Sequence, residues 1–197
     1  MYLNKIKLFL VISICLLFFF LTMYLNKIKL FLVISICLIF FFLTYNDVKS
    51  QEPKIISGIA KVIDGDTIKI RNNKIRLFGI DAPEKKQQCQ KPWLTISIFT
   101  FNKDYQCGEI STNKLKMKIN NKFVMCKSNN KDRYNRFIAE CFKGKININK
   151  WMILNGYAVA YRKYSKKFIS QENLAKKEKL GIWAGTFEMP WEWRKKN

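Results

Sequence analysis

The sequence contains no histidine, and this absence excludes several classes of catalytic site. Ser-His-Asp and Cys-His nucleophilic catalysis both need an imidazole, as do paired-histidine ribonuclease chemistry and the zinc sites with imidazole ligands. Any chemistry carried by this chain must therefore use carboxylates, arginine, lysine, tyrosine or a metal ion bound by oxygen ligands.

Acidic residues are also scarce: 14 Asp and Glu stand against 36 Lys and Arg, for a net charge of +22. Residues 51–197 hold 31 basic and 13 acidic residues, a net charge of +18. Such a charge attracts polyanions, since each neutralised phosphate releases condensed counterions. Nucleic acid is the first candidate partner and an anionic membrane surface the second. A basic composition inherited from an AT-rich genome is the plainer alternative.

The first 44 residues are one segment written twice. Residues 1–22 recur as residues 23–44 with a single difference, Leu17 against Ile39. Each copy has two lysines and then an uncharged apolar run, which is the form of a secretory signal peptide. Each run is also shorter than the ~20 residues that a comfortable membrane span needs.

We interpret residues 1–50 as a duplicated signal peptide with cleavage after Ser50. A two-helix membrane anchor is the alternative, and an uncleaved leader would hold the domain on the outer face. We therefore expect an exported protein, periplasmic or secreted, that contacts a membrane only through this leader if it is not removed.

Cysteine usage agrees with export. Outside the leader the chain has four cysteines, an even number that in an exported domain indicates two disulfides. Cys126 and Cys141 flank a turn sequence symmetrically, so we expect them to pair across a hairpin, which leaves Cys89 and Cys107 to close the loop between them. Four free thiols in the core are the alternative.

The residues after the leader predict a small β-barrel with helices. Segments rich in β-branched residues indicate strands, and apolar residues at helical spacing indicate helices. The expected strands are 55–63, 67–71, 74–80, 122–127 and 136–143, and the expected helices are 108–120, 148–155 and 168–180. Residues 81–105 have two prolines and no clear period, so we expect a long loop there. This order favours an α+β, mainly β fold: a five-stranded OB-fold barrel with about three helices, formed by residues 51–197.

Three short segments concentrate the residues that could carry chemistry. They are Asp64-Gly65-Asp66, the run from Arg76 to Glu84, and the turn from Asp132 to Arg136. An Asp-Gly-Asp sequence alone is most often a turn, and an isolated strand arginine is most often a solvated edge residue. The combination of acids at two strand ends with arginines at two further sites favours function.

These residue types suit the hydrolysis of a phosphodiester bond. Asp66 and Asp81 each lie at a strand end, and two carboxylates with a main-chain carbonyl and waters form the oxygen-rich set that Ca²⁺ or Mg²⁺ prefers. Glu84 follows a rigid Ala-Pro pair and could take a proton from an attacking water. Arg76 and Arg136 offer forked guanidinium groups for the charge that builds on the phosphorus oxygens.

These segments resemble, in order and spacing, those of the thermonuclease (staphylococcal-nuclease-like) family, in its exported bacterial subgroup. The resemblance covers residues 58–183 and includes the run from Ala175 to Trp183, which looks like the last helix of the family and its closing Trp. It implies a Ca²⁺-dependent endonuclease that cleaves DNA and RNA and leaves 3′-phosphate ends, with Mg²⁺ or Mn²⁺ as alternative metals.

The resemblance also implies roles for individual residues. Asp66, Asp81 and the carbonyl of Ala82 match the metal ligands, Asp64 an outer-shell acid, and Glu84 the proposed general base. Arg76 and Arg136 match the two phosphate-binding arginines. Tyr134 and Tyr161 fall where the family packs tyrosines around the nucleotide.

Two positions depart from the family pattern. Ala82 stands where Thr is frequent, so a side-chain hydroxyl is lost while the carbonyl remains. Asn135 replaces a frequent Gly, and we expect the turn to persist because Asn tolerates the left-handed conformation. The aromatic tail after Phe187 is an addition, which we expect to cover the barrel; stacking on bases is the alternative.

The expected function is thus an exported, metal-dependent nuclease that acts as a monomer on DNA and RNA. A non-catalytic OB-fold module that binds nucleic acid is the alternative, and the complete set of acids and arginines argues against it.

Overall fold

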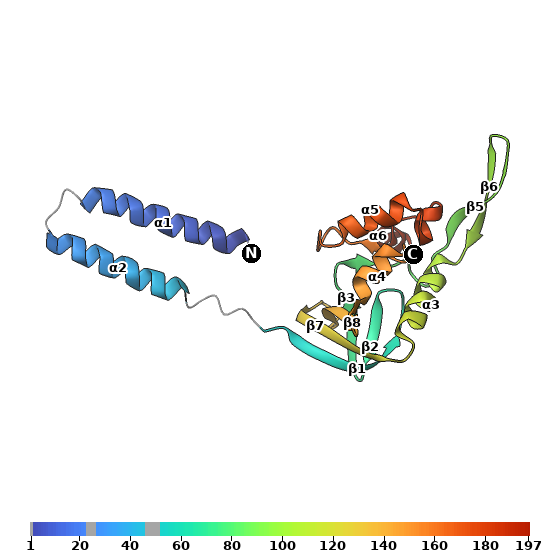
Figure 1. Cartoon of the computed structure of the whole chain (residues 1–197), viewed down its shortest axis with the longest axis horizontal. Coiled ribbons are helices and arrows are strands. Elements are labelled where there is room, and N and C mark those ends of the chain that lie inside the picture. Colours follow the sequence, from blue (N-terminus) through green and yellow to red (C-terminus); the bar gives the residue numbers. More distant parts are fainter. Residues whose placement is uncertain (1, 23–26, 46–51) are drawn as a thin grey trace. The chain divides into compact units, whose positions relative to one another are not determined.

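The computed structural model describes residues 2–22, 27–45 and 52–197, and the chain divides into two compact units, residues 1–51 and 52–197 (Figure 1). The first unit holds two helices, α1 (Tyr2–Thr22) and α2 (Lys27–Tyr45), one from each copy of the repeat. They pack on each other, and equivalent cysteines meet, with Cys15 Sγ 2.9 Å from Cys37 Sγ. Within the described ranges, no helix combines the length and hydropathy needed to cross a bilayer. The expected cleavage position, Ser50, lies outside the described residues.

A five-stranded barrel is the centre of the second unit, as the sequence predicted. Its strands are β1 (Lys54–Val62), β2 (Thr67–Ile70), β3 (Asn73–Leu77), β7 (Phe123–Lys131) and β8 (Phe137–Lys143). They pair in the order β3-β2-β1-β7-β8, and the parallel pairing of β3 with β8 closes the barrel. The short β9 (Ile146–Asn147) continues the sheet beyond β8.

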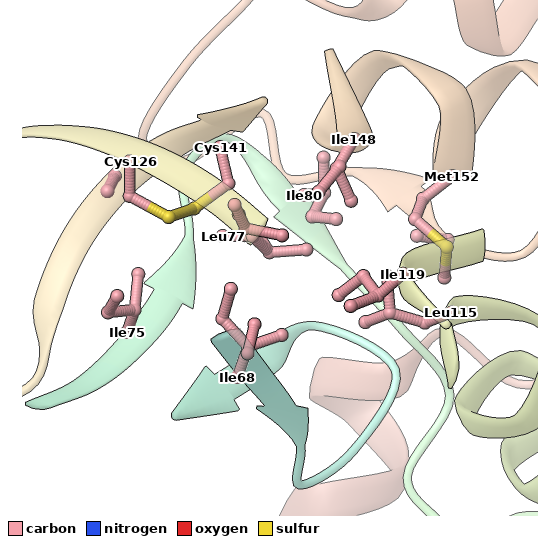
Figure 2. Close-up of a cluster of buried hydrophobic side chains, with 14 of the residues drawn as sticks. Ile68, Ile75, Leu77, Ile80, Leu115, Ile119, Cys126, Cys141, Ile148 and Met152 are labelled. Carbon is pink, nitrogen blue, oxygen red and sulfur yellow. A yellow bond between two sulfur atoms is a disulfide. The ribbon is translucent and has the colours of Figure 1, made fainter. Parts of the chain in front are cut away.

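Alternation along the strands sends apolar side chains inward and leaves polar ones outside. On β3, Ile75 and Leu77 are buried while Arg76 between them faces outward, the period-two pattern of a strand covered on one side. The interior is filled by aliphatic side chains and by the Cys126–Cys141 disulfide (Figure 2). This packing fixes the strand ends that carry the acidic residues.

Helices cover the open ends and sides of the barrel. The expected helices are present as α3 (Cys107–Ile119), α4 (Ile148–Leu154) and α5 (Ile169–Lys177), the last followed by a 3₁₀ turn, η1 (Gly181–Ala184). Leu115 and Ile119 of α3 and Met152 of α4 enter the core (Figure 2). A further helix, α6 (Pro190–Lys196), forms in the C-terminal tail, so the second unit has one α-helix more than the three expected.

The long loop expected for residues 81–105 is a wrong prediction. This segment begins with β4 (Ile80–Asp81), which pairs with β10 (Val159–Ala160), and continues as a hairpin of β5 (Cys89–Ile96) and β6 (Phe99–Tyr105). The hairpin is exposed on both faces, so no burial pattern marks it in the sequence, and Pro92 lies within it.

Both disulfides form as predicted. Cys126 and Cys141 are directly opposite each other in the register of β7 and β8, and Cys89 is bonded to Cys107 at the base of the hairpin. The second disulfide belongs to a small separate hydrophobic cluster with Val159 and Ile182. The aromatic tail packs against this cluster through Phe187, Met189 and Trp191.

Candidate active site

Asp66 is held at the start of β2 by the turn that follows β1. The backbone N–H of Asp66 donates to Asp64 Oδ1 (3.1 Å), and the carbonyl of Asp66 accepts from the N–H of Leu77 (2.8 Å). The side chain of Asp66 is buried and accepts from the Thr67 hydroxyl (2.9 Å) and the Ala82 N–H (3.1 Å). The carboxylate therefore has a fixed position at the end of the barrel.

Gly65 makes this turn sterically feasible. A Cβ atom at position 65 would lie 2.6 Å from the Ala82 Cβ and 2.4 Å from the Ser111 Oγ. Only a residue without a side chain permits so close an approach of the turn to the segment that carries Asp81 and Ala82.

Asp81 is placed by a short strand pairing on the other side of the site. Gly79, with φ +73°, turns the chain after β3, and β4 then pairs with β10 so that Asp81 lies opposite Val159. Glu172 of α5 fixes β10 by accepting from the N–H of Ala160 (2.9 Å). The side chain of Asp81 is completely buried.

Arg76 joins the two aspartates. It lies on β3 opposite Thr67, and its two terminal nitrogens donate separately, Nη1 to Asp66 Oδ1 (2.7 Å) and Nη2 to Asp81 Oδ1 (2.6 Å). The guanidinium group of Arg76, which the sequence predicted to bind phosphate, thus contacts both acids that the sequence predicted as metal ligands.

Glu84 lies beside this cluster on a loop held by Gln87. The backbone N–H of Glu84 donates to Gln87 Oε1 (3.2 Å), and the backbone N–H of Gln87 donates back to the Glu84 carbonyl (2.7 Å). Gln87 Nε2 also donates to the Glu188 carbonyl (2.6 Å), which ties the loop to the C-terminal tail. Gln87 is fully buried, and no sequence pattern predicted a role for it.

Arg194 of α6 completes the cluster and was not predicted. Its Nη2 donates to Asp81 Oδ2 (2.7 Å), while its Nη1 donates to Asp81 Oδ1 (3.0 Å) and to Glu84 Oε1 (2.7 Å). Arg194 lies 113 residues from Asp81 in sequence, so only its tertiary placement reveals the contact. The aromatic and basic composition of the tail was the one available signal.

Burial, neighbouring charges and hydrogen bonds together shift the pKa values of these acids. Burial raises the pKa of Asp66, but Arg76 and hydrogen bonds from Ala82 and Thr67 outweigh it and hold that pKa below its ordinary value. Burial raises the pKa of Asp81, with the charge of Asp66 adding to the rise and the two arginines opposing it. Burial and the negative charge of Asp66 raise the pKa of Asp64 to about 7.

Both arginines remain charged in this environment. Burial alone would lower the pKa of Arg76, but the negative charges of Asp66 and Asp81 outweigh it and hold that pKa above its ordinary value. The pKa of Arg194 is raised in the same way by Asp81 and Glu84 against the effect of burial. The cluster therefore holds two fixed positive charges among three carboxylates.

Arg136 is bound elsewhere, to the turn between β7 and β8. Its Nε donates to Asp132 Oδ2 (2.7 Å) and its backbone N–H to Asp132 Oδ1 (3.0 Å). Asn135 has φ +60°, so the turn keeps the left-handed residue that the sequence analysis expected. In the parallel pairing of β3 and β8, Arg76 lies opposite Ile138. Arg136 itself directly precedes β8, in the turn that leads into this strand.

The two predicted tyrosines differ in their surroundings. Tyr134 is 63% exposed, with the guanidinium carbons of Arg133 and Arg136 at 4.8 and 5.4 Å from its ring centre. Tyr161 is covered by the tail: its ring stacks on Trp191 with centres 5.5 Å apart and planes 10° apart. The ring of Tyr134 thus lies largely in solvent beside two arginines, and that of Tyr161 is covered by the same helix that carries Arg194.

The residues present suit a hard divalent cation. Among the described residues, no group of three or more acidic or cysteine side chains is arranged as a ready metal site. Asp66 and Asp81 nevertheless provide two buried carboxylates at one point, and Ca²⁺ and Mg²⁺ take the remainder of their ligands from carbonyls and water. Without Arg194, the three carboxylates and Arg76 leave a net charge of −2, which a divalent cation would balance.

Comparison with known proteins places this arrangement in a family. The model of the staphylococcal nuclease homologue family matches residues 74–185. A succinoglycan biosynthesis protein, ExoI, of Rhizobium meliloti (strain 1021) is 35% identical over 142 residues, which cover 70% of this chain and 69% of the relative. An uncharacterized endonuclease of Escherichia coli is 31% identical over 144 residues, covering 69% of this chain and 82% of the relative.

A micrococcal nuclease of Shigella flexneri is 28% identical over 156 residues, covering 70% of this chain and 79% of the relative. The region matched by the family model, residues 74–185, includes Arg76, the segment of Asp81 and Glu84, and the turn before Arg136. With its barrel and its cluster of acids and arginines, the chain belongs to the staphylococcal nuclease homologue family.

Proposed function

We propose that this protein is an exported, metal-dependent endonuclease that hydrolyses phosphodiester bonds in DNA and RNA. The observation that carries the proposal is the single guanidinium of Arg76 bound to both Asp66 and Asp81, with Glu84 beside them. Two relatives whose names contain endonuclease or nuclease support it. The duplicated leader and the two disulfides support export.

Asp66, Asp81 and the Ala82 carbonyl would hold the cation, for which Ca²⁺ is the first choice. When bound, such a cation polarises a phosphoryl oxygen and orients water. Because both aspartates are buried and fixed by hydrogen bonds, the ligands are in place before the substrate arrives. Asp64, one turn residue away, supports the backbone of Asp66 as an outer-shell residue.

Glu84 is assigned the role of general base. Its side chain is partly exposed on the side of the cluster that α6 covers, where it can accept a proton from a water aimed at phosphorus. Arg76 on β3 and Arg136 just before β8, the strand that pairs with β3, would donate to the phosphoryl oxygens as negative charge builds on them. In that state Arg136 must release Asp132 and bind phosphate. The free-energy cost of breaking this ion pair is small, because both side chains are partly solvated.

Arg194 occupies the position that a cation and a substrate would share. It neutralises Asp81 and Glu84 and is only about one-third exposed, while Trp191 of the same helix covers Tyr161. We assign to α6 the role of a covering segment that moves away when metal and nucleic acid bind, which frees both carboxylates and the tyrosine ring.

The test is a degradation assay on residues 52–197 under oxidising conditions. Plasmid DNA and RNA are incubated with Ca²⁺, with Mg²⁺, with Mn²⁺ and with excess chelator. The proposal predicts cleavage of both substrates that needs Ca²⁺ and stops with chelator, and products that carry 3′-phosphate ends.

The opposite result would favour a binding module. A folded protein that retards nucleic acid on a gel but leaves it intact with every metal would refute the catalytic proposal. Cleavage that continues in excess chelator would refute the metal dependence alone.

A further inference from the structure

The hairpin of β5 and β6, which we call the arm (residues 89–105), projects from the second unit beyond its helices (Figure 1). Every residue from 90 to 104 is exposed. The two strands are joined by a short turn at Ser97 and Ile98, in which Ser97 has φ +54°. The arm therefore contributes little to the core, and its conformation needs another explanation.

The base of the arm is rigidly held. The Cys89–Cys107 disulfide joins it to α3, and Gln90 exchanges two backbone hydrogen bonds with Thr186, of 2.8 and 2.9 Å. A two-stranded hairpin alone is marginally stable in water. The anchors at the base let this one keep its shape without a covering layer.

The outer part of the arm has one apolar face. The register pairs Leu94 with Phe101 and Ile96 with Phe99, so these four side chains share a face, while Thr95 and Thr100 pair on the other. Phe99 is 65% exposed, and Ile98 at the tip is 86% exposed. An exposed apolar patch of this kind marks an interaction site.

The charges on the arm are arranged in layers. Residues 92–102 carry no charge, although the whole chain has a net charge of +22. At the base, Lys91 and Lys103 lie directly opposite each other, next to the pair of Gln90 and Asp104, and Lys91 Nζ lies 5.4 Å from the centre of the Tyr105 ring. Like charges directly opposite each other disfavour a hairpin, and an external anion beside the two ammonium groups would relieve this repulsion. Two further lysines, Lys85 and Lys86, precede the arm.

We propose that the arm docks this protein on the surface of an anionic lipid bilayer. The uncharged outer part enters the boundary between headgroups and acyl chains, and the Lys91–Lys103 pair lies at the level of the lipid phosphates. Five residues of strand reach about 15 Å, enough for the ~5–10 Å depth at which interfacial segments insert. The sequence alone had led us to expect membrane contact only through the leader.

Two other occupants fit the arm less well. Single-stranded nucleic acid needs cations beside the stacking rings to meet each phosphate, and the outer part has none. A second copy of the arm packed face to face would bring two Lys91–Lys103 pairs together. A lipid surface satisfies the apolar face and the paired lysines at once.

The test uses residues 52–197, a compact unit with its own cores and both disulfides and without the apolar leader. Co-sedimentation is measured with vesicles of phosphatidylcholine alone and of phosphatidylcholine mixed with phosphatidylglycerol. We expect binding to the anionic vesicles. Ile98→Ser with Phe99→Ser should weaken it about tenfold or more, because the side chains that enter the bilayer are lost.

A matched control makes the same change elsewhere. Ile59→Ser with Phe123→Ser also removes one exposed Ile and one exposed Phe, from neighbouring strands of the barrel, and should bind vesicles as the parent does. Lys91→Gln with Lys103→Gln should reduce the preference for phosphatidylglycerol. Near-ultraviolet circular dichroism of each variant checks that the fold is kept.

Two results would overturn the proposal. Either the parent unit does not bind anionic vesicles, or the variant with serines at the tip binds them as well as the parent does. In the second case, a loss by that variant of affinity for single-stranded DNA, or a conversion from dimer to monomer, would identify nucleic acid or a second copy as the occupant. None of these results depends on nuclease activity, so failure here leaves the proposed function standing.

Discussion

At the scale of single residues, the site depends on very close packing around charged groups. Arg76 bridges two buried aspartates, and the turn that carries one of them approaches Ala82 so closely that position 65 has no room for a side chain. The charged residues form the cluster, and the small ones decide whether the charged ones can meet.

Gly65→Ala should therefore destabilise the fold and displace Asp66. The new methyl group would overlap the Ala82 Cβ, at 2.6 Å, so we expect a loss of about 1–3 kcal/mol in the free energy of unfolding. Urea unfolding of residues 52–197 measures this loss. The double variant with Ala82→Gly should recover part of it, since the two sites share one contact. An unchanged unfolding midpoint for Gly65→Ala would show that the turn has room to relax.

The sequence predicted some of these residues and not others for clear physical reasons. Asp66, Asp81 and Arg76 lie on strands that adjoin in sequence, so a meander brings them together. Arg136 was predicted to bind phosphate, and in the structure its guanidinium binds Asp132, a carboxylate four residues earlier in the same turn. Arg194 meets Asp81 across 113 residues, a distance over which no local pattern carries information.

At the scale of secondary-structure elements, a two-residue pairing holds half of the site. Asp81 belongs to β4, whose partner is β10, and β10 is fixed by Glu172 of α5. The Glu172 side chain is buried and also pairs with Arg162 and Lys176. The buried carboxylate of Glu172 on one helix thus positions Asp81, the carboxylate that we propose as a metal ligand, on a strand.

Glu172→Gln should lower stability in a pH-dependent way. Burial raises the pKa of Glu172, but Arg162, the Ala160 N–H and Lys176 outweigh it and hold that pKa below its ordinary 4.5. The contribution of Glu172 is therefore present above pH 4.5 and is lost as the pH falls through the lowered pKa. We expect a cost of about 1–3 kcal/mol at neutral pH that shrinks in acid.

Unfolding curves at several pH values measure this cost, and Glu178→Gln, an exposed change just after the same helix, is the control. A cost that stays constant down to the acid limit would contradict the assignment of a charged Glu172.

Arg194→Gln should strengthen binding of Ca²⁺. If Arg194 competes with the cation for Asp81, its loss should lower the Ca²⁺ concentration for half-saturation roughly three- to tenfold. Calorimetric titration of Ca²⁺ without nucleic acid measures this directly. Lys195→Gln removes the same charge from the same helix, from a residue paired with Glu192, and should change little. Weaker Ca²⁺ binding by Arg194→Gln would mean that Arg194 supports the site and does not cover it.

The helix α6 and the strands of the arm are the secondary-structure elements that the sequence did not predict. The barrel strands were predicted because one face of each is buried, which leaves alternating apolar residues. The arm is exposed on both faces, and Pro92 within it argued against a strand. A solvent-exposed hairpin held by a disulfide and by Thr186 has its cause in contacts outside its own sequence.

At the scale of the whole molecule, the chain combines two compact units of different character. Residues 1–51 hold an apolar repeat, and residues 52–197 hold a basic barrel with two disulfides and the acidic cluster at one end. The high positive charge of the second unit suits a polyanionic substrate and raises the rate of encounter with it. Within this basic unit, three of the few acidic residues, Asp66, Asp81 and Glu84, lie together in one cluster.

The measurement that tests this account most directly is the cleavage rate of Glu84→Gln beside its affinity for the same DNA. The account predicts a rate lower by about 10²–10⁴-fold in Ca²⁺, because the proton acceptor is lost, with DNA affinity and unfolding midpoint close to those of the parent. Glu109→Gln, at an exposed position of α3, should cleave at the parent rate. If Glu84→Gln cleaves DNA as fast as the parent, the catalytic centre does not lie at this cluster.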